Sequence, residues 1–185
     1  MPSVVGVSGG VHRPSRTTAL VRAILDAVGE RMEAQPRLID LGAVGQALLA
    51  SADGSLPSEG RDVVAAVEGA DLLVVASPVY RASYTGLFKH LFDLVGQDAL
   101  AARPVILAAT GGSELHGLVI EHQLRPLFGF FGAFTVPTGV YATPAAFEDD
   151  RVTAAPVRQR IDRAVAEAVA ILEANRKLVG AAAGR

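Results

Sequence analysis

Short runs of apolar, mostly β-branched residues alternate along this chain with longer segments in which apolar residues recur every three or four positions. The short runs predict buried strands at 4–8, 37–41, 71–77, 104–109 and 135–141. The longer segments predict helices at 17–32, 61–69, 84–95, 118–131 and 157–177. This alternation predicts an α/β fold, a doubly wound sheet of five parallel strands with helices on both faces.

Proline, glycine and polar clusters mark where the predicted elements end. Pro78 closes the third strand, and Pro126 predicts a kinked or divided helix within 118–131. The stretch 42–60 is predicted to be mostly loop with one short helix. Neither a repeat nor a linker interrupts the pattern, so residues 1–179 are predicted to form one domain, with 180–185 as a frayed tail.

Composition and charge exclude several classes of function. With 17 basic and 19 acidic residues, the net charge of −2 argues against a nucleic-acid binder. The absence of cysteine excludes disulfides, thiolate metal sites and thiol nucleophiles. The four histidines, at 12, 90, 116 and 122, lack the spacing of metal ligands, and no GxSxG sequence marks a hydrolase. We therefore expect no metal and no catalytic acid, base or nucleophile.

No targeting or membrane segment is visible. The first apolar run, 4–7, is far shorter than the core of a signal peptide, and charges, prolines or glycines interrupt every longer one. The sequence predicts a cytoplasmic protein without a membrane partner.

Ligands of doubly wound folds bind beyond the carboxyl ends of the strands, which here means the loops after Ser8, Ser77 and Ala109. The first loop joins a strand to a helix and contains glycines, hydroxyls and arginines. It could bind a phosphate through the helix N-terminus, through Ser15 and Thr17, and through Arg13 or Arg16. The alternative is that Ser15 only caps the helix and that the arginines are solvated. GxxxxGK[ST] and GxGxxG are both absent, which argues against a P-loop and a dinucleotide fingerprint.

The other two loops could face a flat ring. After Pro78, small residues leave backbone amides free to approach a heteroaromatic ring, against which Tyr80 could pack. The sequence Thr110-Gly111-Gly112-Ser113 exposes backbone and hydroxyls in the same way. The alternative is that Tyr80 lies at the rim of the core and that the third loop is an ordinary turn.

Three segments, Val7–Thr17, Ser77–Gly86 and Thr110–Ser113, resemble in sequence and order the NADPH-dependent FMN reductase family. The likeness extends over residues 4–152 and is strongest to the reductases of two-component alkanesulfonate and methanesulfonate monooxygenases. The resemblance implies a flavodoxin-like fold, FMN as the flavin, and NADPH or NADH as the hydride donor. The FMN-binding residues that we expect are Ser8, Arg13, Ser15, Arg16, Thr17, Pro78, Val79, Tyr80, Arg81, Thr110, Gly111, Gly112 and Ser113.

The resemblance also implies partners. It predicts a homodimer or homotetramer formed through the helices that begin near Thr85 and Leu118, and a monooxygenase that receives the reduced FMN. His122 lies where the alkanesulfonate branch often carries a tyrosine linked to a π-bulge, which favours the methanesulfonate-like branch; alternatively, it is a surface histidine. Two other functions stay open: a quinone or azo reductase that retains its FMN, and a flavodoxin-type electron carrier, which would be more acidic.

Overall fold

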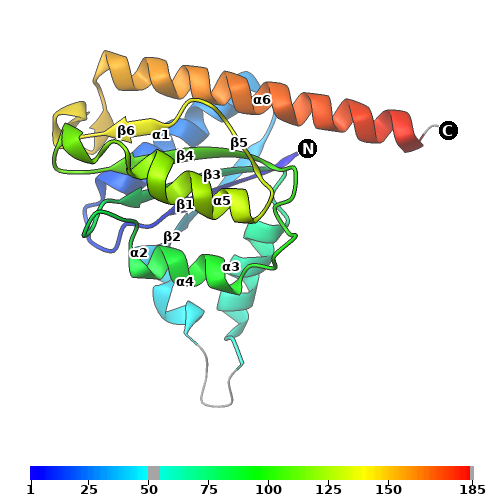
Figure 1. Ribbon diagram of the computed structural model, residues 1–185, viewed down its shortest axis with the longest axis horizontal. Coiled ribbons are helices and arrows are strands. Elements are labelled where there is room, and N and C mark those ends of the chain that lie inside the picture. Colours follow the sequence, from blue (N-terminus) through cyan, green and yellow to red (C-terminus); the bar gives the residue numbers. More distant parts are fainter. Residues whose placement is uncertain (50–54, 184–185) are drawn as a thin grey trace.

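Parallel strands form the centre of the computed structural model, which describes residues 1–49 and 55–183 (Figure 1). The strand order β2-β1-β3-β4-β5 is that of flavodoxin-like sheets, and every pairing within the sheet is parallel. A further strand, β6, pairs with the carboxyl end of β4. The bounds are β1 Ser3–Ser8, β2 Gln35–Asp40, β3 Leu72–Pro78, β4 Pro104–Thr110, β5 Phe134–Thr135 and β6 Val140–Ala142. The predicted doubly wound α/β fold is confirmed.

The fifth strand position differs from the prediction of one continuous strand over 135–141. It is divided into β5 and β6, because Pro137 lacks the N–H that a ladder needs and the backbone N–H of Thr138 donates elsewhere. Thr138 donates from its backbone N and its Oγ1 to the carboxylate of Glu167, at 2.9 and 2.7 Å. Glu167, on the helix that follows in the neighbouring layer, thus accepts the backbone N–H of Thr138 that a continuous strand would offer to its neighbour in the sheet.

Helices cover both faces of the sheet. On one face lie α1 (Arg16–Arg31) and α6 (Ala155–Ala183), and on the other α3 (Ser58–Glu68), α4 (Gly86–Leu94) and α5 (Arg125–Phe130). Each layer has its own apolar core. The structure continues α6 through Ala183, past the predicted end at Lys177, so the tail predicted at 180–185 begins inside a helix; residues 184–185 lie outside the described residues.

The segment after β2 contains more structure than the single short helix predicted there. A short helix, α2 (Leu41–Val44), passes into a 3₁₀ turn, η1 (Gly45–Leu48). Residues 50–54 of this stretch lie outside the described residues. Among the described residues, no helix combines the length and the apolar character that crossing a membrane requires.

Phenylalanines join α4 to α5 beneath the sheet. Phe92 and Phe128 meet edge to face with ring centroids 4.8 Å apart, and Phe88 and Phe131 complete the cluster. All four side chains are buried. This cluster holds the helices that follow two of the three loops identified above.

The predicted break within 118–131 is confirmed, and it has an unusual form. A 3₁₀ turn, η2 (Glu114–His116), leads to a π-helix, η3 (Ile120–Leu124), which passes directly into α5. Pro126 is the second residue of α5, directly after the π-helix, and because it has no N–H it cannot donate to a carbonyl of the preceding helical turn. His122 is exposed and lies within the π-helix, as the resemblance implied.

A small hairpin that we did not predict lies between β6 and α6. A 3₁₀ turn, η4 (Pro144–Ala146), leads into β7 (Phe147–Glu148), which pairs antiparallel with β8 (Arg151–Val152). The two residues of its turn, Asp149 and Asp150, have left-handed φ values of 46° and 59°. Aspartate and asparagine adopt this conformation more readily than other non-glycine residues.

Candidate functional site

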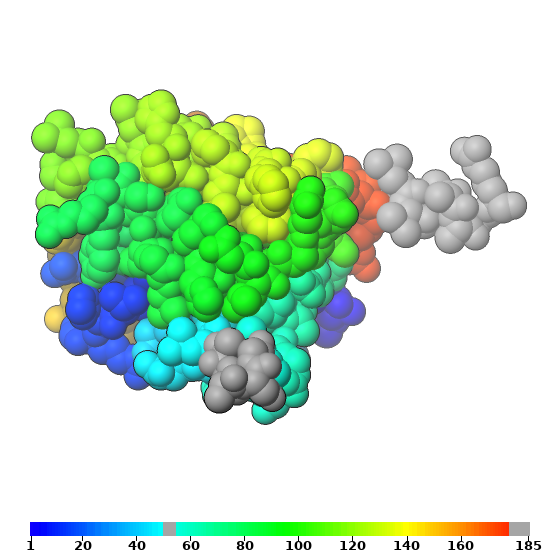
Figure 2. Space-filling model, turned by 60° about the horizontal axis from the view of Figure 1, so that its bottom comes forward, coloured from blue at the N-terminus to red at the C-terminus, as the bar shows by residue number. Residues whose placement is uncertain are grey.

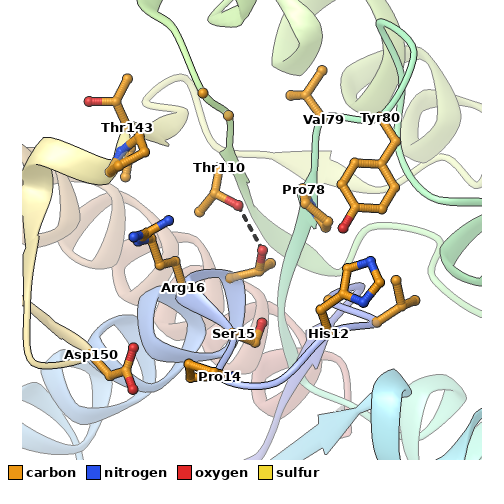
Figure 3. Close-up of a pocket in the computed structure, with 17 residues that line it drawn as sticks. His12, Pro14, Ser15, Arg16, Pro78, Val79, Tyr80, Thr110, Thr143 and Asp150 are labelled. Carbon is orange, nitrogen blue, oxygen red and sulfur yellow. Dashed lines mark hydrogen bonds between the residues drawn. The ribbon is translucent and has the colours of Figure 1, made fainter.

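A cavity of about 330 Å³ opens at the carboxyl ends of β1, β3 and β4 (Figure 3). The three loops that the sequence singled out meet in its wall, although they are far apart along the chain. The predicted site residues that line it are Ser15, Arg16, Thr17, Pro78, Val79, Tyr80, Thr110, Gly111 and Gly112.

The remaining predicted residues lie outside the lining. Ser8 is buried beneath the first loop, where its hydroxyl meets that of Thr18 at 2.9 Å. Arg13 is turned toward Asp40, with 3.4 Å between Nη2 and Oδ2. Arg81 lies in an exposed turn. Ser113 directly follows Gly112, which is the last residue of the third loop to line the cavity.

Several lining residues were missed by sequence reasoning. Val11 and His12 belong to the first loop, whereas Thr143 and Pro144 follow β6 and Asp150 comes from the β7–β8 hairpin. The rule that directed attention to strand ends applies equally to β6. It could have found Thr143 if the fifth strand position had been followed to its end.

The first loop is held by a helix cap and by bonds to its neighbours. Ser15 caps α1, and its Oγ accepts from the backbone N of Thr18 at 3.1 Å. A Cβ at Gly10 would collide with that same Oγ, so the close approach of the two residues requires glycine. Gly9 donates to the carbonyl of Ala76 at 2.7 Å and accepts from Thr85 Oγ1 at 3.0 Å. The free N–H groups of the helix N-terminus are thereby directed at the cavity.

Two buried threonines connect the first loop to the third. The Oγ1 atoms of Thr17 and Thr110 lie 2.7 Å apart, and both residues line the cavity (Figure 3). One hydroxyl donates to the other, so the acceptor keeps its own hydrogen for a further partner. Among the described residues, no buried side-chain nitrogen or oxygen lacks a hydrogen-bond partner.

The middle loop makes a tight turn that leaves Tyr80 at the mouth of the cavity. Tyr80 and Ser83 exchange backbone hydrogen bonds of 2.9 and 3.1 Å across Arg81 and Ala82, both of which have left-handed φ values. The Tyr80 side chain is 42% exposed, and its ring centroid lies 6.2 Å from that of His12. Both rings stand on the same side of the cavity, opposite Arg16 and Asp150 (Figure 3).

The third loop is supported from below by Tyr141 on β6. The Tyr141 hydroxyl donates to the carbonyl of Ser113 at 2.6 Å, and a Cβ at Gly111 would collide with it. Burial raises the pKa of Tyr141, and the charge of Glu114 raises it further, so the hydroxyl stays a donor at neutral pH. Gly111 also donates its N–H to the carbonyl of Ala142 at 3.1 Å. The third loop therefore has a defined position before any ligand binds.

A second, smaller cavity of about 180 Å³ adjoins the first at Val79. Its walls are mainly apolar and come from the middle loop, η2 and the π-helix, with His116 and His122 among them. Ser83 Oγ donates to Gln123 Oε1 at 3.0 Å and so links the middle loop to the π-helix. In the part of the chain that the structure describes, no group of three or more histidine or acidic side chains is arranged to hold a metal ion.

The site is thus a polar pocket at a helix N-terminus that adjoins the loops Pro78–Tyr80 and Thr110–Gly112. The backbone N–H groups of Val79 and Tyr80, expected to be free to face a ring, instead donate to the carbonyls of Thr110 and Ser83 at 2.8 and 2.9 Å, because the middle loop closes on itself and on β4. A phosphate group fits the polar pocket, since N–H groups, hydroxyls and Arg16 converge there. A flat ring fits between the loops at Pro78–Tyr80 and Thr110–Gly112.

Comparisons of the sequence and of the structure with known proteins agree on the family to which the chain is similar. The family model for NADPH-dependent FMN reductase matches residues 2–148. The chain is 51% identical over 177 residues to the NADH-dependent FMN reductase SfnE of Pseudomonas putida, covering 95% of each protein. It is 50% identical over 174 residues to an FMN reductase (NADPH) of Pseudomonas aeruginosa, covering 94% of this chain and 93% of that one. A solved oxidoreductase structure from Corynebacterium diphtheriae superposes with a TM-score of 0.80 at 35% identity, covering 93% of this chain and 97% of the other.

Proposed function

This chain belongs to the NADPH-dependent FMN reductase family, and from that premise we propose that it reduces FMN with a nicotinamide dinucleotide and releases the product to a partner monooxygenase. The observation that carries the proposal is that one cavity joins a polar pocket at a helix N-terminus to the space between the loops Pro78–Tyr80 and Thr110–Gly112. Neither feature alone would distinguish a flavin site from a simple anion site. Together they match a ligand with a phosphate at one end and a flat ring at the other.

The first loop would hold the phosphate of FMN. Ser15 and the N-terminus of α1 offer N–H and hydroxyl donors, Arg16 supplies a positive charge, and the Thr17–Thr110 pair offers one free O–H. Ser8 supports the first loop from the protein side, because its Oγ accepts a hydrogen bond from the backbone N of Gly10 at 3.4 Å.

Pro78, Val79 and Tyr80 would hold the isoalloxazine ring together with the loop from Thr110 to Gly112, since both segments line the cavity. FMN supplies the redox chemistry when bound, since its ring accepts hydride from the nicotinamide. The protein's contribution is to hold and orient the ring. No side chain of this chain needs to act as acid, base or nucleophile.

The hydride donor is NADH or NADPH, and the relatives differ on this point. The Pseudomonas putida relative is named as NADH-dependent and the Pseudomonas aeruginosa relative as an NADPH enzyme, at nearly equal identity. Arg13 is bonded to Asp40, whereas Arg81 is exposed in the turn after Tyr80 and is the candidate to meet the 2′-phosphate of NADPH. We place the reaction in the cytoplasm, where both dinucleotides are available.

The protein associates with copies of itself through α4 and the segment around α5. These segments lie side by side on one face of the molecule (Figure 2). Leu115, Leu118, Phe130 and Phe134, which lie on the stretch from η2 to β5, are 89%, 64%, 64% and 49% exposed, and an interface between copies would remove these apolar side chains from water.

The test is the oxidation of NADH and of NADPH by purified protein, followed by absorbance with and without added FMN. A rate that rises and saturates with FMN supports a reductase for which FMN is a substrate. If added FMN has no effect on a protein that already contains flavin, while a quinone accelerates turnover, the protein is instead a flavin-retaining quinone reductase. Absence of oxidation under every condition would overturn the enzymatic proposal.

A further inference from the structure

The cavity has an unusual balance of charge for a site that takes a phosphate. Of its lining residues, Arg16 and Asp150 are the two with full charges at neutral pH, and they are of opposite sign. Arg13, the other arginine of the first loop, lies outside the lining and is paired with Asp40. A phosphate monoester carries nearly two negative charges at pH 7 and would therefore meet one cation and one anion.

The position of Asp150 is set by its backbone. Asp149 and Asp150 form the turn between β7 and β8, both in the left-handed conformation, and the pairs Phe147–Val152 and Glu148–Arg151 close the hairpin. The backbone N of Thr153 donates to the carbonyl of Ala146 at 2.9 Å, which ties the hairpin to η4. Of the two turn residues, only Asp150 lines the cavity, on the same side as Arg16 (Figure 3).

We propose that Asp150 is a specificity-determining residue that weakens the binding of phosphate-bearing flavin by opposing Arg16. The inference rests on the proposed function, because it concerns the same cavity and the same ligand. Neutral donors of the first loop position the phosphate, whereas the two exposed charges set how tightly it is held. The carboxylate cancels part of the attraction from Arg16 and so favours exchange of FMN at each turnover over permanent retention.

Asp150→Asn removes the charge and leaves the turn intact, because asparagine tolerates the left-handed conformation as well as aspartate does. Asp149→Asn is the matched control, since it makes the same change one residue away, outside the cavity lining. Riboflavin is the second control, because it has the ring and the ribityl chain of FMN without the phosphate.

The experiment measures dissociation constants by quenching of flavin fluorescence for wild type, D150N and D149N, each with FMN and with riboflavin. We expect D150N to bind FMN about fivefold more tightly, as one removed repulsion at a solvent-screened site should give. Riboflavin affinity should stay within about twofold in all three proteins, and the gain for FMN should shrink in about 1 M salt.

Two results would overturn the inference alone: equal FMN affinity in wild type and D150N, or a loss of affinity for both flavins in D150N. The second result would mean that the carboxylate accepts a hydrogen bond from the ribityl chain. If none of the three proteins binds FMN saturably, the proposed function falls together with this inference.

Discussion

The threonine pair in the wall of the cavity permits a substitution experiment that separates folding from flavin binding. Thr17 and Thr110 are 3% and 7% exposed, and their Oγ1 atoms lie 2.7 Å apart. Valine at either position leaves the other hydroxyl buried without this partner, which lowers the free energy of unfolding by about 2 kcal/mol. Valine at both positions removes both hydroxyls, so the double variant should lose only about 1 kcal/mol instead of the sum of about 4.

Urea unfolding of the wild type, the two single variants and T17V/T110V measures these losses, and an unchanged slope with denaturant shows that each compares the same transition. Thr143→Val is the matched control, because Thr143 lines the same cavity and its side chain makes no capping hydrogen bond. Its free energy of unfolding should change by less than about 0.5 kcal/mol.

Flavin binding should respond differently from stability in the same set of proteins. The pair leaves one hydroxyl hydrogen for the phosphate, and each single variant still keeps one, so FMN affinity should change little in the single variants and fall in T17V/T110V, where none remains. A double variant that loses the full sum in stability would refute the argument that the two hydroxyls satisfy each other. Wild-type FMN affinity in T17V/T110V would show that the pair serves folding alone.

Three further outcomes follow from other contacts. Tyr141→Phe removes the donor to the carbonyl of Ser113 and should raise the KM for FMN about fivefold while changing kcat less than about twofold. Steady-state kinetics of NAD(P)H oxidation measure both constants. A fall in kcat at unchanged KM would contradict the positioning role of Tyr141. Arg125 lowers the pKa of Glu121 below its ordinary value of 4.5, so the ion pair stabilises the fold above that pH and is lost as the pH falls through the lowered value. The Tm of Glu121→Gln should therefore lie a few degrees below that of the wild type at neutral pH and should match it in acid, whereas a gap that persists in acid would show that the pair is not its cause. Phe128→Ala opens a cavity within the buried phenylalanine cluster and should lower the free energy of unfolding by about 4 kcal/mol in a urea titration. A loss below about 1 kcal/mol would mean that the cluster repacks around the shorter side chain.

Elements with an uninterrupted hydrophobic pattern were predicted to within a few residues. The fourth strand, expected at 104–109, is β4 at Pro104–Thr110, and the first helix, expected at 17–32, is α1 at Arg16–Arg31. The fifth strand could not be predicted in the same way. Pro137 was a readable signal against a continuous strand, but the other cause, the bonds from Thr138 to Glu167, joins residues 29 positions apart on different layers, and periodicity says nothing about such a partner.

The candidate site was predictable where it follows the ends of the three long strands. The rule of strand ends led to the loops that contain Thr17, Tyr80 and Gly111, and the structure brings all three into one cavity. The wall formed by Thr143 and Asp150 was missed, because the segment after β6 has no apolar run long enough to mark its short strands. The role of Tyr141 was missed because the hydrophobic pattern of a strand shows only that the residue is large. Its hydroxyl donates to Ser113, which is 28 positions away along the chain.

The residues that fix the shape of the cavity are different from those that give it charge. Its geometry depends on buried, neutral contacts: the Ser15 cap, the Thr17–Thr110 pair and the hydroxyl of Tyr141. Its charges, on Arg16 and Asp150, are exposed and therefore screened by salt. We accordingly expect the recognition of flavin shape to survive high ionic strength while the preference for FMN over riboflavin declines. This combination would suit the proposed exchange of FMN at each turnover, because rigid neutral contacts position the ligand without adding the electrostatic attraction that would retain the product.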